Sequence, residues 1–159
     1  MTRMRTLRRM RFLRGERGAA LVEFAIVLPL LLMIVFGIID FARAFYTQNN
    51  LTSAVREGAR WAAVRDPAKI TTAGVQAVVK GFANADATKA KFGGSAVADA
   101  QISITFTPAL PDANYITVTI TDYPFDWWTP LPGMVGFGDI TLSAEAVFRL
   151  EHAGSAPAP

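Results

Sequence analysis

The chain has 159 residues, of which 52% are hydrophobic, and a formal net charge of +3. This length predicts one folded domain. The absence of cysteine excludes disulfides and thiolate metal sites. With a single histidine, His152, neither a metal-ligand cluster nor a Ser/His/Asp catalytic set is expected. We therefore predict a protein that is not an enzyme and that carries no metal and no cofactor.

The first 18 residues are strongly basic. They contain seven arginines and one acidic residue, Glu16, for a net charge of +6. Of the 16 basic and 13 acidic residues in the chain, 9 and 12 remain, so the rest has a net charge of −3. Arginines can neutralise nucleic-acid phosphates. However, an apolar stretch follows at once, and positive charge beside a membrane segment stays in the cytoplasm. We interpret residues 1–18 as a cytoplasmic leader and expect no nucleic-acid partner.

An apolar stretch runs from Ala19 to Ile39 and is interrupted only by Glu23. As a helix it would rise about 30 Å, the thickness of a hydrocarbon core. It is longer than the apolar core of a secretory signal peptide, and no clear A-x-A cleavage pattern follows it. We predict a retained transmembrane helix over 19–40 in the inner membrane, with the N-terminus in the cytoplasm and the C-terminal domain outside. Aromatic residues that suit the belt at a membrane surface follow this helix: Phe41, Phe45 and Tyr46.

Glu23 is the unusual residue of this stretch. A charge at mid-bilayer costs about 2.5–3.5 kcal/mol on the mildest scale, and Glu23 bears a smaller cost because it is close to the basic flank. One interpretation is a carboxylate that reaches the membrane surface and pairs with Arg17. The other is a carboxylate placed to meet a specific partner, since pairing removes much of the cost of burying a charge.

The surrounding residues favour the second interpretation. A basic leader, Gly18 and an apolar segment with glutamate at its fifth position resemble a prepilin cleavage site. Phe24 resembles the aromatic residue that often follows this glutamate in the Flp/Tad branch. The opening RGAALVEFA, followed by LPLL at 28–31, and the block AVREGARWAA at 54–63 resemble two conserved blocks of the TadE-like family. The resemblance covers residues 17–63, and residues 64–159 carry no motif that we can match.

This resemblance implies a pseudopilin or minor pilin of the tight-adherence machinery, which builds Flp pili for adhesion and biofilm formation. It implies that a prepilin peptidase cuts between Gly18 and Ala19, and that Glu23 then neutralises the N-terminal amine of a neighbouring subunit. The implied partners are the bacterial inner membrane, the prepilin peptidase, and other Tad/Flp pilins and pseudopilins. The implied location is the inner membrane with a periplasmic C-terminal domain, or association with the pilus.

The helical pattern continues beyond the membrane. Pro29 predicts a mild kink, which membrane helices tolerate, or a weak point in the helix. Residues 41–64 are predicted to extend the helix until Asp66-Pro67 ends it. Small and apolar residues share one face of this extension: Leu51, Ala54, Val55, Gly58, Ala59 and Ala62.

A helix packing block is expected within this extension, and it comprises Arg56, Glu57, Gly58, Ala59 and Arg60. Its small residues let another backbone come close. Glu57 and Arg60 can pair at i, i+3 for a few tenths of a kcal/mol. We favour packing against the chain's own sheet over a seam between subunits.

Residues 65–151 are predicted to form a periplasmic α+β domain, which begins with a helix over 71–83 and a loop over 84–95. The connector Pro108–Asp112 suits a hairpin, and residues 152–159 are expected to form a disordered tail. Alternating apolar and polar residues predict half-buried strands of an antiparallel sheet: 102–106, 116–121 and 140–150. The predicted fold is thus α+β and pilin-like, with a long N-terminal helix whose first half spans the membrane once and whose second half packs on a small sheet.

Aromatic residues are dense between the second and third predicted strands: Tyr123, Phe125, Trp127 and Trp128 lie within the predicted loop 123–132. Two interpretations remain open, a plug over the edge of the sheet and a contact surface. Residues 133–138 are rich in glycine, but no phosphate-loop arrangement follows, so we predict a flexible turn.

A second class of protein is compatible with a single apolar span: a signal-anchored envelope enzyme or ligand-binding domain unrelated to pili. Asp122 and Asp126 are close in sequence, yet no further residue supports them as an active site. An assembly component needs neither an active site nor a cytoplasmic signalling domain, so we favour it.

Overall fold

The computed structural model describes residues 15–84, 95–110, 113–129 and 138–151, together with Gly133 and Gly136. Most of the predicted leader, nearly all of the predicted loop 84–95 and the whole predicted tail lie outside the described residues.

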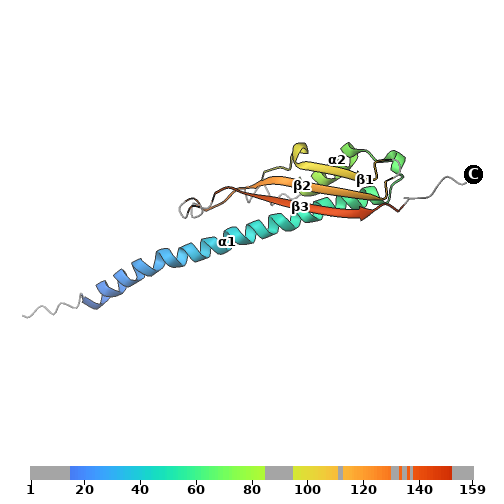
Figure 1. Ribbon diagram of the computed structural model, residues 1–159. Coiled ribbons are helices and arrows are strands. Elements are labelled where there is room, and N and C mark those ends of the chain that lie inside the picture. Colours follow the sequence, from blue (N-terminus) through green and yellow to red (C-terminus); the bar gives the residue numbers. More distant parts are fainter. Residues whose placement is uncertain are drawn as a thin grey trace, which may run out of the picture.

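A long helix, a short helix and a three-stranded sheet make up the fold (Figure 1). The helices are α1 (Gly15–Ala63) and α2 (Thr72–Asn84), and the strands are β1 (Ile102–Thr107), β2 (Tyr115–Phe125) and β3 (Ile140–Arg149). Short 3-10 turns lie at Pro67–Lys69 and Asp99–Gln101. The sheet has the order β1-β2-β3, and both strand pairs are antiparallel. The predicted α+β class, with a long helix packed on a small antiparallel sheet, is confirmed.

The first half of α1 extends away from the folded domain (Figure 1). Among the described residues, this helix alone is long and apolar enough to cross a membrane, and none of its most apolar 18-residue window is buried. The core helix of a soluble protein would bury such a window. Large apolar side chains are exposed along the whole stretch, from Leu21 at 69% to Ile38 at 63%. The helix is therefore a candidate membrane span.

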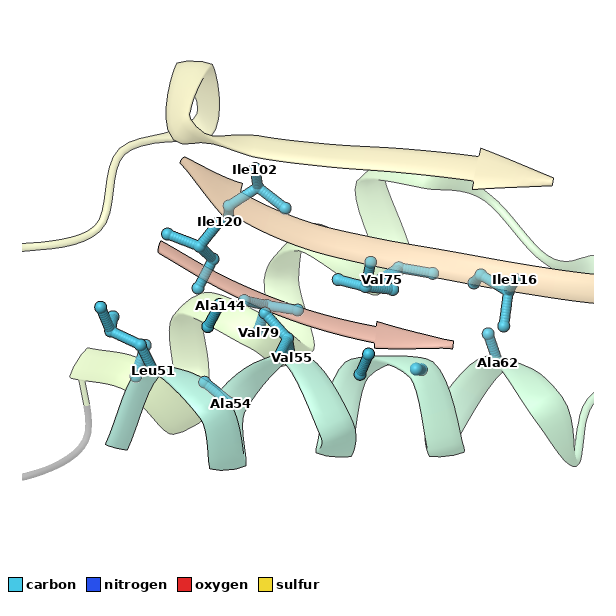
Figure 2. Packing of buried hydrophobic residues seen from close by; sticks show 14 of the residues in the cluster. Leu51, Ala54, Val55, Ala62, Val75, Val79, Ile102, Ile116, Ile120 and Ala144 are labelled. Carbon is cyan, nitrogen blue, oxygen red and sulfur yellow. The ribbon is translucent and has the colours of Figure 1, made fainter. Parts of the chain in front are cut away.

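The second half of α1 carries the domain. All six residues of the predicted face are buried, and Leu51, Val55 and Ala62 point toward Ile116 and Ile120 of the sheet (Figure 2). Burying apolar side chains between α1 and the sheet supplies the main driving force for folding of the domain. The gain is about 25 cal/mol per Å² of apolar surface removed from water.

Helix α2 packs beside α1 at a point of close approach. A Cβ added at Gly58 would lie 2.3 Å from Val79 Cγ2, so only glycine fits there without movement. Thr71 caps the N-terminus of α2, because its Oγ1 accepts the N–H of Gly74 over 3.1 Å. Gly58 thus packs against a helix, whereas packing against the sheet was expected.

Strand β2 is longer than predicted. The sequence pattern predicts that the strand ends at Thr121 and that Tyr123 and Phe125 lie in a loop, whereas in the structure the strand continues to Phe125. The register shifts between Ile120 and Tyr123, and Asp122 has a φ of 53°. This bulge reverses the alternation, so Tyr123 and Phe125 are buried. Pro124 is tolerated because β1 pairs only with residues 115–120 and leaves this end of β2 uncovered on one side.

Candidate functional site

The residues of the predicted cleavage and assembly site lie on the exposed half of α1. This helix begins at Gly15, so Gly18 and Ala19 are already helical, and it continues through Pro29. A Cβ built at Gly18 meets no atom within 4 Å, and Phe24 is 58% exposed. Gly18, Ala19 and Phe24 therefore have open space around them in the single chain.

Glu23 is exposed on the same half of the helix. No described side chain forms an ion pair with it, and the side chain of Arg17 lies outside the described part. In water an exposed carboxylate is solvated, but in lipid it requires a partner or the membrane surface. The chain leaves Glu23 accessible to a group from another molecule.

A cluster of polar contacts marks the point where the exposed half of α1 meets the domain. Asp40 is 2% exposed, although it follows the apolar stretch directly. Its carboxylate accepts three hydrogen bonds: from Arg43 Nη1 over 3.3 Å, from the N–H of Trp128 over 3.2 Å, and from the hydroxyl of Thr129. A buried carboxylate with this number of donors is satisfied. We call Asp40, Arg43 and Thr129 the junction cluster.

Arg43 extends the junction cluster to the end of β2. It donates to the backbone carbonyl of Asp126 over 3.3 Å, and its guanidinium lies 5.5 Å from the centroid of the Phe125 ring. The side chain of Arg43 is only 12% exposed, so these contacts replace water around its charge. These contacts fix the end of β2 to α1. In Figure 1, β2 runs along α1 toward the exposed half of the helix.

The four aromatic residues of the predicted loop have different environments. Tyr123 is 1% exposed, and its hydroxyl donates to the carbonyl of Ser95 over 2.6 Å. Burial, reinforced by the charge of Asp126, raises the pKa of Tyr123 above its ordinary value. Phe125 and Trp127 form an edge-to-face pair with centroids 5.3 Å apart, and Trp127 Nε1 donates to the carbonyl of Gly138. Trp128 is 69% exposed. Tyr123 and Phe125 are therefore core residues, and Trp128 is free for an outside contact.

The helix packing block divides into a buried and an exposed part. Gly58 and Ala59 are buried against the chain's own domain, and Arg56 is exposed. Arg60 donates two hydrogen bonds to the Glu57 carboxylate, over 3.0 and 2.6 Å, and this hydrogen bonding holds the pKa of Glu57 below its usual value. Solvent screens a pair this exposed, so it contributes little to stability.

The junction cluster was not predicted from the sequence, because no motif marks Asp40, Arg43 or Thr129. A signal was present: Asp40 precedes Leu51 by eleven residues, which is close to three helical turns. Asp40 therefore lies on the face that becomes buried further along α1. Thr129 is 89 residues from Asp40 in the sequence. No local pattern could therefore predict its hydrogen bond to Asp40.

Comparison with known proteins agrees with the resemblance found in the sequence. Residues 18–60, or 43 of the 159 residues, match the family model described as TadE-like protein. No curated protein and no solved structure matches the chain. The family consists of pilus components and not of enzymes, and the match suggests involvement in the Tad/Flp pilus system at the membrane. The chain thus matches the suspected TadE-like family over residues 18–60, within α1.

Proposed function

We propose that this protein is a pseudopilin or minor pilin-like component of Flp pilus assembly that acts through contacts between subunits in adhesion and biofilm formation. Its N-terminus lies in the cytoplasm and its folded domain in the periplasm, a direction that the basic leader supports. The partners in this proposal are the inner membrane, the prepilin peptidase and other Tad/Flp pilins and pseudopilins.

One observation carries the proposal: α1 is a single helix with two different surfaces. Its second half is buried under the domain, while its first half exposes apolar side chains and one carboxylate, Glu23. A helix that only anchors a domain gains nothing from a carboxylate in lipid, which costs insertion energy. A helix that packs against other helices in an assembly can pair that carboxylate.

The assembly step follows from charge pairing. Cleavage after Gly18 would create a new N-terminal amine on Ala19, at the membrane end of α1. In an array of staggered subunits, the Glu23 carboxylate of one copy would neutralise the amine of the next. Each charge then loses much of the penalty it would bear alone in a low-dielectric environment. The pairing would favour one axial offset between neighbouring subunits, the offset that brings Glu23 beside the amine.

A replacement of the membrane half of α1 tests the proposal. Residues 19–39 are exchanged for an unrelated transmembrane helix of equal length, and surface pili are counted in a strain that lacks the native gene. The pilin-like function requires the exchange to abolish piliation although the domain remains exported and folded. If the exchanged protein restores pili fully, α1 is only an anchor, and the proposed action through subunit contacts of this helix is wrong.

The accessibility of Gly18 motivates a prediction about processing. The mature protein, extracted from membranes that contain an active prepilin peptidase, is expected to lack residues 1–18. Gly18→Asp should block this loss, because it puts a charged side chain at the cleavage position, and Gly37→Asp should not block it. Intact mass spectrometry measures both. A wild-type protein that still begins at Met1 would refute cleavage.

A further inference from the structure

Trp128 lies where the exposed half of α1 meets the domain. Its backbone N–H donates to Asp40 Oδ1 over 3.2 Å, which holds this residue at the level of position 40 on the helix. Among the described side chains of α1, Asp40 is the first buried one from the N-terminal side. Trp128 therefore stands at the height where the apolar stretch ends.

The side chain of Trp128 is more exposed than those of the other two tryptophans. It is 69% exposed, whereas those of Trp61 and Trp127 are half-buried. An indole left in water forgoes the gain from burying its large apolar surface. Because its ring is apolar and its N–H is polar, tryptophan is enriched at the interface between hydrocarbon and water.

Other exposed aromatic residues occur at the same height. Phe41 and Phe45 are 73% and 60% exposed. At about 100° per residue, they lie about 100° and 140° around the helix from Asp40. Phe36, which is 36% exposed, lies about 40° around the helix from Asp40 but one turn further into the apolar stretch. Trp128 therefore adds an aromatic residue on the side of Asp40 at the level of Asp40 itself, through the junction cluster.

Two charged side chains of the junction cluster, those of Arg43 and Asp40, do not oppose contact of Trp128 with lipid, while the carboxylate of Asp126, two residues before Trp128, is exposed. Arg43 is largely covered, and it donates to Asp40 and to the carbonyl of Asp126. The Asp40 carboxylate is covered as well and accepts hydrogen bonds from Arg43, Trp128 and Thr129. The indole thus projects from a cluster whose charges are already satisfied.

We propose that the Trp128 indole binds the headgroup zone of a phospholipid bilayer, at the periplasmic end of the span, and that the junction cluster sets its depth. This inference rests on the membrane embedding of α1 in the proposed function. It gives the domain two points of membrane contact, the helix and the end of β2. Two points restrict the angle between the domain and the membrane, and so present each subunit to its neighbours in one orientation.

Fluorescence quenching tests the contact on the full chain, purified and reconstituted in vesicles of phosphatidylethanolamine and phosphatidylglycerol. Bromine atoms on the acyl chains, placed near the headgroups or near the bilayer centre, quench tryptophan at short range. Emission of the wild type is expected to fall in brominated vesicles, and to fall more with the shallow bromines. Trp128→Phe should lose this quenching, while Trp127→Phe should retain it.

Several results would overturn the inference. If brominated lipids quench the wild type and Trp128→Phe alike, or if aqueous iodide reaches Trp128 freely in the vesicles, the indole is not in the bilayer. Quenching that disappears at high protein density would instead assign Trp128 to a second copy of the chain. If the protein is inserted but Trp128 is not quenched, the inference about Trp128 is wrong and the proposed function stands. If alkaline carbonate removes the protein from the vesicles, both the inference and the proposed function are wrong.

Discussion

Glu23→Ala is expected to abolish surface pili while the protein remains inserted, folded and cleaved. If Glu23 pairs with an amine of a neighbouring subunit, its loss leaves that amine unpaired in lipid. Breaking one side of a buried pair costs roughly 3–5 kcal/mol, which lowers association by several hundredfold or more at about 1.4 kcal/mol per decade. Surface pili, membrane abundance and leader removal are measured on one strain.

Glu57→Ala is the matched control for this substitution. Glu57 is also a glutamate of α1, but it pairs with Arg60 on the exposed surface of the domain. Solvent screens such a pair, so its removal changes stability little. This variant should assemble pili normally. Normal piliation by a stable Glu23→Ala protein would show that Glu23 is only an interfacial carboxylate.

Asp40→Ala is expected to release the end of β2 from α1 and to lower the free energy of unfolding of the domain. The substitution removes the acceptor for Thr129 and for the N–H of Trp128, and leaves the buried charge of Arg43 without its carboxylate. Loss of one partner from a buried pair costs on the order of 3–5 kcal/mol. Denaturant unfolding measures the stability, and hydrogen exchange measures the protection of the Trp128 amide.

Asp139→Ala provides the control, since Asp139 is an exposed aspartate between β2 and β3. It should change neither stability nor the exchange of the Trp128 amide. The double variant Asp40→Leu/Arg43→Leu should recover part of the loss, because both charges leave the junction together. An Asp40→Ala protein as stable as the wild type, with the Trp128 amide still protected, would contradict the role of the junction cluster.

The periodic parts of the fold were predictable from the sequence. The buried face of α1 from Leu51 to Ala62 shows a helical period, and the alternation of Ile116, Val118 and Ile120 identifies the middle of β2. Helix α2 has a threonine cap and apolar residues at helical spacing, and the structure places it within one residue of the predicted bounds. These signals are local in the sequence, and the tertiary contacts of the fold agree with them.

Features that depend on distant contacts were not predictable. The bulge at Asp122 changes which residues of β2 face the core, and strict alternation cannot detect an inserted residue. Asp40 has the same sequence surroundings whether it faces water or accepts a hydrogen bond from Thr129. Its burial depends on residues 126–129, which follow β2 and contact α1 although they are more than 80 residues away in sequence.

Photocrosslinking from the membrane half of α1 tests directly whether Glu23 pairs with a neighbouring pilin subunit. A photoreactive residue replaces Val27, one helical turn from Glu23 and 57% exposed, in cells that express the Tad/Flp machinery. We expect adducts with other pilins or pseudopilins, identified by mass spectrometry, that disappear when Glu23→Ala is added. Absence of pilin adducts from the stable, inserted wild-type chain, or adducts that Glu23→Ala leaves unchanged, would contradict assembly through this carboxylate.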